Sequence, residues 1–195
     1  MSASPLQWRA RGALASLDDA TRTALLRRDG GDAARSGSDA DTVRARTRDI
    51  IDAVRTRGDE ALRALAQQFD GVTLDAIDVP RRDWTRALDA LDPSLRRALE
   101  RSATNIATVH TAFRPSAVEV SPEPGIVIGR RPDPLARVGV YAPGGRAAYP
   151  SSLLMGAVPA RVAGVGEVIV CSPPASNGRP TDVVLAAAAL AQVDH

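Results

Sequence analysis

The residues whose types could support chemistry gather between Arg137 and Cys171. An apolar run, Val138 to Tyr141, stops at the turn Pro143-Gly144-Gly145. Backbone N–H groups of such a turn, together with the N-terminus of a following helix, can face a phosphate or a nicotinamide. Tyr141 would lie at the carboxyl end of a strand, where open α/β sheets bind their ligands. A plain tight turn stays an equal alternative, because neither GxGxxG nor GxxxxGK[ST] occurs.

Metal ligands and nucleophiles are scarce in this sequence. It contains two histidines and one cysteine, and the spacings HxxxH, HxxE and CxxC do not occur. We therefore assign no metal ligand and no catalytic residue from spacing. Cys171 ends an apolar run and could line the same crevice as Tyr141, but buried strand cysteines are usually inert. His110 is interpreted as a boundary or capping group rather than as a ligand.

The segment around the turn predicts a strand, a glycine turn, a helix and a second strand, which together form one βαβ crossover. The helix is expected from about Ser151 to Gly164, with Ser151 or Ser152 as its cap. The second strand is expected over Val168 to Cys171. A further helix from Thr181 or Asp182 to about Gln192 follows. A two-stranded sheet is too small to be stable alone, so a third strand is expected where the sequence ends. We expect either that the sequence is truncated or that the sheet is completed by something outside it.

Upstream, cap and stop signals predict a helix-rich region. Asp41 or Thr42, Asp59 and Asp92 are the expected N-caps, while Gly58 and Asp70-Gly71 end helices. The predicted helices cover residues 17–26, 41–57, 59–70, 81–91 and 93–112. Apolar positions at helical spacing give two of them a predicted buried face; these positions are Val43, Thr47, Ile50, Ile51 and Val54 in one helix and Leu95, Leu99, Ala103, Ile106 and Phe113 in the other.

Two short apolar runs, Val118 to Val120 and Ile126 to Ile128, flank Pro122-Glu123-Pro124-Gly125 and predict a β-hairpin or two edge strands. The prolines around residues 131–136 then predict a domain boundary. We expect an N-terminal arm (1–38), a helix-rich first part of domain one with the hairpin (39–131) and an α/β part (132–195). The arm, which carries Trp8, could dock on a partner subunit or on its own domain.

Composition narrows the class of protein further. Hydrophobic residues make up 44% of the 195 residues but aromatic residues only 3%, which suits a core of small aliphatic side chains between helices and a parallel sheet. Every basic residue is arginine, and the formal charge is only +2 with both signs mixed, so we expect no nucleic-acid partner. Neither a membrane-spanning run nor a signal core is present, and one cysteine fits a reducing compartment. A cytoplasmic protein is expected.

The stretch RVGVYAPGGRAAYPSSLLMGAVPARVAGVGEVIVCSPP closely resembles the histidinol dehydrogenase family. The similarity is long and ungapped, and therefore far more specific than a glycine pattern. Two upstream stretches also resemble the family: IIDAVRTRGDEALRALAQQFDGV (Ile50 to Val72) and LDPSLRRALERSATNIATVHTAF (Leu91 to Phe113). The resemblance runs from about Trp8 to His195.

The resemblance implies an NAD-dependent, zinc-requiring enzyme that oxidises L-histidinol to L-histidine through the aldehyde, in two hydride transfers. It implies a homodimer and an α/β fold of the aldehyde-dehydrogenase-like class, in which a helical region precedes an incomplete Rossmann-like NAD-binding unit (132–195). Tyr141 matches the family's tyrosine that contacts NAD, Pro143 lines the same cofactor site, and Phe69 of the FDG motif is expected to touch NAD.

The same resemblance implies that the family's GGAQA and FGPGN segments, its zinc ligands and its glutamate-histidine bases lie downstream of the matching part. None of them occurs here, so we expect this chain alone to be inactive. A non-catalytic remnant or dimerisation module is the alternative, and a stable dimer without NAD affinity would favour it. An arginine-rich nucleic-acid binder is a third hypothesis, against which the balanced charge argues.

Overall fold

The computed structural model describes residues 16–26, 37–144 and 147–195. The chain divides into two compact units, Met1–Thr56 and Arg57–His195. The site and the core described below both lie in the second unit. Trp8, which belongs to the predicted N-terminal arm, lies outside the described residues.

The first unit contains α1 (Asp19–Leu26) and most of α2 (Gly37–Arg57). Asp18 caps α1, because its carboxylate accepts the Thr21 N–H at 2.8 Å. The predicted cap of α2 at Asp41 or Thr42 is wrong: the helix begins at Gly37, so Asp41 lies inside it and pairs with Arg44 at 3.4 Å. The predicted buried face is also not formed within the described residues, since Val43 is 63% exposed and Ile51 45%.

The second unit begins with three helices, α3 (Asp59–Asp70), α4 (Arg81–Ala90) and α5 (Pro93–Phe113). Gly58 has φ 55° and precedes α3, so Asp59 is the first helical residue and not the expected cap. Gly71, in the left-handed conformation, ends α3 as predicted. The predicted cap of α5 is confirmed: the Asp92 carboxylate accepts the N–H groups of Ser94 and Leu95 at 2.9 and 3.2 Å.

The predicted buried face of α5 forms only in its middle. Leu99 is 7% exposed, and Ala103 and Ile106 pack against the core. Leu95 and Phe113 are 40% and 77% exposed, which corrects the expectation that they line the buried face. The reason is length, because α5 has 21 residues and packs on α6 (Pro150–Ala163), which has 14, so the ends of α5 extend past its neighbour.

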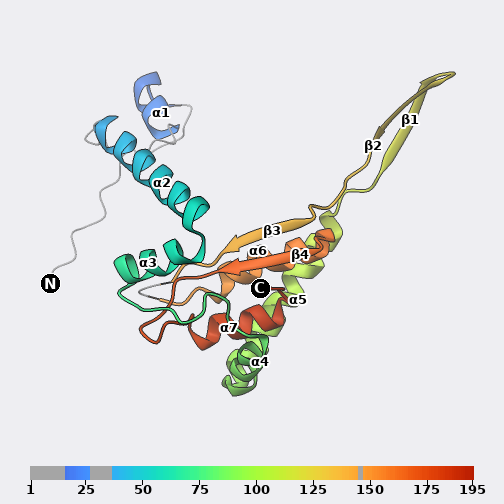
Figure 1. The fold of residues 1–195 in the computed structure, drawn as a ribbon. Helices are drawn as coiled ribbons and strands as arrows, with labels where there is room; N and C mark the ends of the chain where they lie inside the picture. The colour runs from blue at the N-terminus through green and yellow to red at the C-terminus, as the bar shows by residue number, and fades with distance from the viewer. Residues whose placement is uncertain (1–15, 27–36, 145–146) are drawn as a thin grey trace. The chain divides into compact units, whose positions relative to one another are not determined.

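The predicted βαβ crossover is present. Strand β3 (Arg137–Tyr141) runs parallel to β4 (Glu167–Cys171), and α6 connects them. Figure 1 shows α6 against the two strands, with α5 and α7 (Asp182–Leu190) beyond it. The predicted cap of α6 at Ser151 or Ser152 is wrong, because Tyr149 holds the N-cap position and Pro150 opens the helix. Gly164, with φ 88°, ends α6 as expected.

The sheet presents two different faces. Val138 and Val140 of β3 and Val168 and Val170 of β4 pack against the core that the helices share. Because strand side chains alternate, Tyr141, Ile169 and Cys171 point to the opposite face, where Tyr141 is 67% exposed and Cys171 is exposed. Most of the core is small, as the composition predicted; its largest fully buried side chains are Leu153, Leu154, Val168 and Val193.

Residues after α7 pair with the free edge of β4. The N–H of Val170 donates to the carbonyl of His195 at 2.7 Å, and the N–H groups of Asp194 and His195 donate to the carbonyl of Val168 at 2.8 and 3.5 Å. This is the pattern of a parallel ladder in which His195 lies opposite Ile169. Among the described residues the parallel sheet itself has two strands, β3 and β4.

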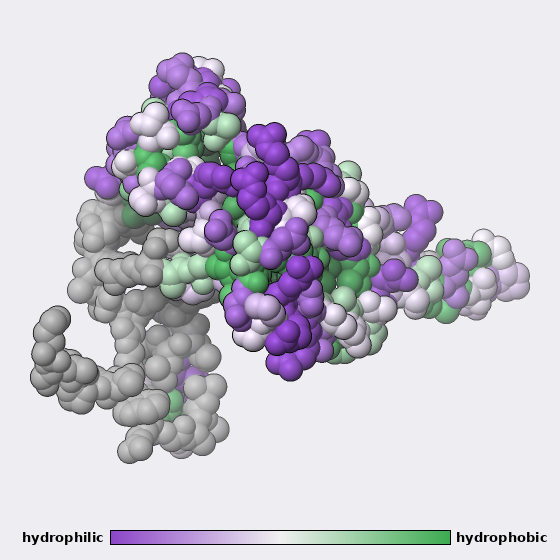
Figure 2. Space-filling view, turned by 90° about the horizontal axis from the view of Figure 1, so that it is seen from below, coloured by the Kyte–Doolittle hydropathy of each residue, from purple (hydrophilic) through white to green (hydrophobic). Residues whose placement is uncertain are grey.

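The predicted hairpin is confirmed as β1 (Val118–Glu123) and β2 (Ile126–Arg130), joined through Gly125 with φ 85°. A bulge lies between Val120 and Glu123, which is where Pro122 cannot donate a ladder hydrogen bond. All residues of both strands are exposed. Figure 2 shows hydrophobic residues between hydrophilic ones on this hairpin.

Candidate functional site

The loop after β3 lies at the carboxyl end of the sheet, where the sequence placed a ligand site. The N–H of Ala142 donates to the carbonyl of Cys171 at 2.9 Å, and Ala142 is fully buried. A Cβ added at Gly144 would lie 3.4 Å from Cδ of Pro173, so the loops after β3 and β4 touch each other. The Tyr141 side chain stands beside this anchored backbone and remains 67% exposed. A fixed backbone with an exposed aromatic ring suits a flat ligand at this edge.

The three predicted cofactor-binding residues come from two different parts of the second unit. Tyr141 and Pro143 belong to the same loop, in which Pro143 is half-buried. Phe69 lies in the last turn of α3 and is 64% exposed. Gly145, the second glycine of the turn, lies outside the described residues.

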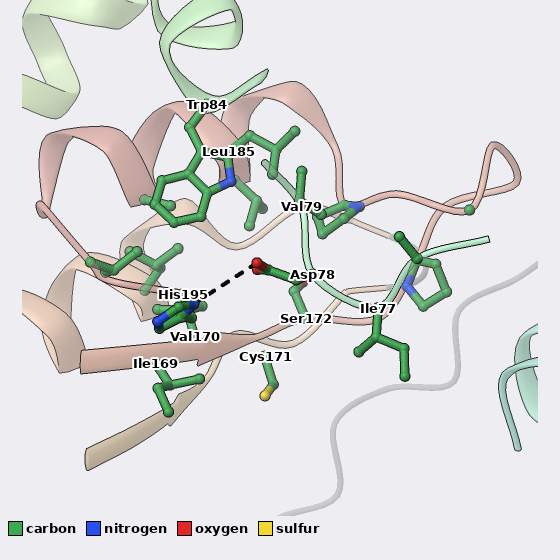
Figure 3. Close-up of a pocket in the computed structure, with 18 of the residues that line it drawn as sticks. Ile77, Asp78, Val79, Trp84, Ile169, Val170, Cys171, Ser172, Leu185 and His195 are labelled. Atoms are coloured by element: carbon green, nitrogen blue, oxygen red, sulfur yellow. Dashed lines mark ion pairs between the residues drawn. The ribbon is translucent and has the colours of Figure 1, made fainter. Parts of the chain in front are cut away.

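A cavity that the sequence did not predict lies on the other side of β4 from β3. Its volume is about 380 Å³, and its walls come from the free edge of β4, from α7 and from the segment 74–79 between α3 and α4 (Figure 3). Most of its lining is apolar, and none of Tyr141, Pro143 and Phe69 contributes to it. The labelled lining residues are Ile77, Asp78, Val79, Trp84, Ile169, Val170, Cys171, Ser172, Leu185 and His195.

Cys171 lines this cavity, whereas its register partner Tyr141, on the same face of the sheet, does not. The segment 74–79, for which the sequence predicted neither a helix nor a strand, forms one wall of the cavity. Its apolar residues, Leu74, Ile77 and Val79, have no helical or strand period. The pattern therefore gave no reason to place them opposite β4.

Charged groups hold the chain end against the edge of β4. The Asp194 carboxylate accepts the Val168 N–H at 2.8 Å and also pairs with Arg161. Arg81 donates to the Asp194 backbone carbonyl at 3.1 Å. The Val168 hydrogen bond is the largest cause that holds the pKa of Asp194 below its usual range, and the two arginines add to it.

At the cavity mouth, His195 lies between two carboxylates. Its Nδ1 is 3.9 Å from Asp78, the pair dashed in Figure 3, and its Nε2 is 3.8 Å from Glu167. Glu167 also pairs with Arg137.

The described residues do not fit a zinc site. Among residues 16–26, 37–144 and 147–195, no three or more His, Cys, Asp or Glu side chains group so that they could hold a metal ion. No described helix has the length and apolar character that crossing a membrane requires.

Comparison with known proteins places the chain in a family. The family model described as histidinol dehydrogenase matches residues 33–195. Histidinol dehydrogenase of Oceanobacillus iheyensis is 46% identical over 144 residues, which cover 74% of this chain and 34% of the relative. Histidinol dehydrogenase of Halobacterium salinarum is 46% identical over 183 residues, which cover 94% of this chain and 40% of the relative.

The fold agrees with a solved structure. The crystal structure of histidinol dehydrogenase from Elizabethkingia anophelis superposes with a TM-score of 0.74 at 26% sequence identity, covering 77% of this chain and 35% of that chain. The chain spans about a third of the length of that protein and 34% and 40% of the two curated relatives. A family model that matches 163 consecutive residues is decisive, and this chain belongs to the histidinol dehydrogenase family.

Proposed function

We propose that this chain supplies one wall of the cofactor site of an NAD-dependent histidinol dehydrogenase. The complete enzyme would oxidise L-histidinol to L-histidine through histidinaldehyde, as part of histidine biosynthesis in the cytoplasm. The observation that carries the proposal is the family match over residues 33–195. The anchored loop after β3, at the carboxyl end of a parallel pair, supports it.

Tyr141 and Pro143 are the proposed cofactor-binding residues of that wall, with Phe69 as a third. The exposed ring of Tyr141 would stack on or flank a flat cofactor ring, while Pro143 keeps the loop stiff. Bound at this wall, NAD would supply the hydride acceptor of the reaction. The corresponding division into an arm (1–38), a helical part (39–131) and an incomplete Rossmann-like unit (132–195) belongs to the same proposal.

The zinc ligands and the general bases of the reaction would have to come from outside the described residues, which hold no fitting group. Without them no residue here would take the proton from the alcohol oxygen. We therefore propose that the 195-residue chain alone is inactive, and that a homodimer belongs to the longer enzyme. The experiment is to incubate the purified chain with L-histidinol and NAD and to follow NADH absorbance, with a longer relative as the positive control. NADH production that depends on histidinol would refute the proposed inactivity.

NAD binding is tested separately from turnover. Titration of the ¹⁵N-labelled chain with NAD is expected to shift the amide signals of Tyr141, Ala142 and Gly144. Tyr141→Ala should weaken binding about tenfold, which corresponds to about 1.4 kcal/mol. Phe113→Ala is the matched control, because Phe113 is also an exposed aromatic residue, at 77% against 67% for Tyr141, and lies on α5. Unchanged signals in the Tyr141 loop at millimolar NAD would remove this loop from the cofactor site.

The alternative function, a non-catalytic dimerisation module, has one observation in its favour. The hairpin exposes Val120, Val127 and Ile128 at 57%, 66% and 59%, and contiguous exposed apolar groups often mark an interaction surface. A monodisperse dimer that shows no NAD-induced shifts would favour this alternative. A monomer that shows them would exclude it.

A further inference from the structure

The β4–α7 loop, residues 172–181, begins against the turn that follows β3. A Cβ added at Gly144 would lie 3.4–3.6 Å from three ring atoms of Pro173, which is ordinary van der Waals contact. Pro174 follows directly, and two successive prolines restrict the backbone at this point. The ring of Pro173 is therefore a stiff support for the Tyr141–Gly144 loop.

The same loop also contacts the chain that leaves α3, the helix that carries Phe69 (Figure 1). A Cβ at Gly178 would lie 3.6 Å from the Leu74 side chain and 3.6 Å from the Thr73 carbonyl oxygen. The Thr73 hydroxyl in turn donates to the side chain of Gln67 in α3 at 2.9 Å. The β4–α7 loop thus touches both parts of the second unit from which the predicted cofactor-binding residues come.

Hydrogen bonds close residues 175–179 of this loop into one turn. The Ala175 N–H donates to the Arg179 carbonyl and the Gly178 N–H to the Ala175 carbonyl, both at 2.8 Å. The side chain of Asn177 accepts the Arg179 N–H at 3.1 Å. Gly178 has φ 75°, the left-handed conformation that glycine adopts without strain. The turn and the two prolines before it are expected to move as one body.

Arg179 is the only charged residue of the β4–α7 loop, and it ties the closed turn to α4. Its guanidinium lies 3.1 Å from the carboxylate of Asp83, whose side chain is only 12% exposed. Arg86, on α4 itself, pairs with the same carboxylate at 3.5 Å. Of the two arginines, Arg179 alone connects the loop to the helix, whereas the Arg86 pair lies within α4.

We propose that the β4–α7 loop sets the relative position of the two parts of the cofactor site, and that Arg179 is a positioning residue for NAD binding. The ion pair with Asp83 holds the closed turn in place. The turn contacts the segment after α3, and the prolines before it support Gly144. The inference rests on the proposed function, because it concerns how that cofactor site is held.

The test compares removal of each arginine from the same carboxylate in the full chain. Arg179→Ala breaks the link between loop and helix but leaves Asp83 paired with Arg86. Arg86→Ala is the matched control, because it removes an equivalent charge and leaves the link intact. Arg179→Lys keeps the charge and should restore much of what Arg179→Ala loses. Equal urea midpoints for the two alanine variants would show that a difference between them is not a loss of stability.

The first measurement follows the ¹⁵N-labelled chain without NAD. Arg179→Ala should shift the amide signals of Gly144 and Thr73 together and increase their mobility in ¹⁵N relaxation, while Arg86→Ala should leave both unchanged. Pro173→Ala is a second variant that keeps the ion pair. It should move the Gly144 signal but not that of Thr73, because the ring touches only the first of them.

The second measurement is NAD titration of the same variants. An ion pair between partly exposed groups is weak, and its loss cannot change NAD affinity by more than the pair contributes. Arg179→Ala should therefore weaken binding about two- to fivefold. Arg86→Ala should bind like the wild type, and Arg179→Lys should lie closer to the wild type than Arg179→Ala does.

The outcomes separate this inference from the proposed function. If the wild type bound NAD and Arg179→Ala bound it equally well, or if the two alanine variants behaved alike, the positioning role of Arg179 would be overturned while the cofactor site would stand. If NAD shifted no signal of the wild-type Tyr141 loop, the cofactor site itself would be refuted, and the role of Arg179 in binding with it.

Discussion

A single side chain, Asp194, connects three elements of the second unit. It accepts from the backbone of β4 at Val168 and pairs with Arg161 of α6, while Arg81 of α4 donates to its backbone carbonyl and approaches its carboxylate at 3.4 Å. The hydrogen bonds and charges favour the ionised carboxylate, which is why its pKa is lowered. The ionised form of the Asp194 side chain therefore stabilises the fold more than the protonated form does.

The first prediction is the pH dependence of Asp194→Asn. The folded-state pKa is below the unfolded value of about 3.9, so the stabilisation is present above that value and is lost as pH falls through the folded pKa. The variant should have a lower urea midpoint than the wild type at pH 7. The gap should narrow as the pH is lowered from about 5 to about 3.

Asp75→Asn is the control for this experiment, because Asp75 is an exposed carboxylate in the segment 74–79 and is outside the Asp194 network. It should leave the midpoint close to that of the wild type at every pH. A gap for Asp194→Asn that stays constant across this range would contradict the assigned role of the charge.

At the scale of elements, the contact between α6 and β3 depends on a missing side chain. A Cβ at Gly156 would lie 2.6 Å from Cγ1 of Val140, closer than real Cβ contacts. The helix and the strand can approach this closely because position 156 carries no side chain. The same close approach lets the short α6 lie across both strands.

The second prediction follows from this approach. Gly156→Ala should lower the free energy of unfolding by about 1–3 kcal/mol, because overpacking forces α6 away from β3. Urea unfolding measures it. Met155→Ala, at a 68% exposed position on the same helix, should change the value by less than about 0.5 kcal/mol. If Gly156→Ala proved neutral or stabilising, the close packing of α6 on β3 would not hold in solution.

At the scale of the whole second unit, stability rests on a core of small aliphatic residues. Its cluster joins α4, α5, α6, α7 and both parallel strands. The hairpin strands contribute no residue to this cluster. Substitutions in the two places should therefore have very different costs.

The third prediction compares two leucines. Leu154→Ala, at a fully buried position in α6, should lower the free energy of unfolding by about 2–5 kcal/mol through lost burial and the cavity left behind. Leu135→Ala, at a 66% exposed position in the connector before β3, should cost less than about 0.5 kcal/mol. Thermal or urea denaturation followed by circular dichroism checks both values. Similar losses for the two variants would show that the core is not where the structure puts it.

Much of the local structure follows from single residues that the sequence displays. Asp92 before Pro93, Gly71 after Asp70 and Gly164 after Ala163 each set a helix end where it was predicted. The apolar runs on either side of the Pro143-Gly144 turn predicted the βαβ crossover, and the long motif predicted the family. These features depend on interactions within a few residues, or on a pattern read directly from the chain, so no tertiary contact was needed to find them.

The burial of helix faces and the cavity at the β4 edge were decided only by tertiary structure. Phe113 fits an apolar stripe but stays exposed, because α5 is longer than α6, the helix on which it packs. The cavity brings together residues 74–79, 169–172 and 184–195, which are distant in sequence and share no period. The sequence by itself determined the family, the crossover and the small-residue core. The cavity exists only because two segments distant in sequence, residues 74–79 and 184–195, fold against the edge of β4.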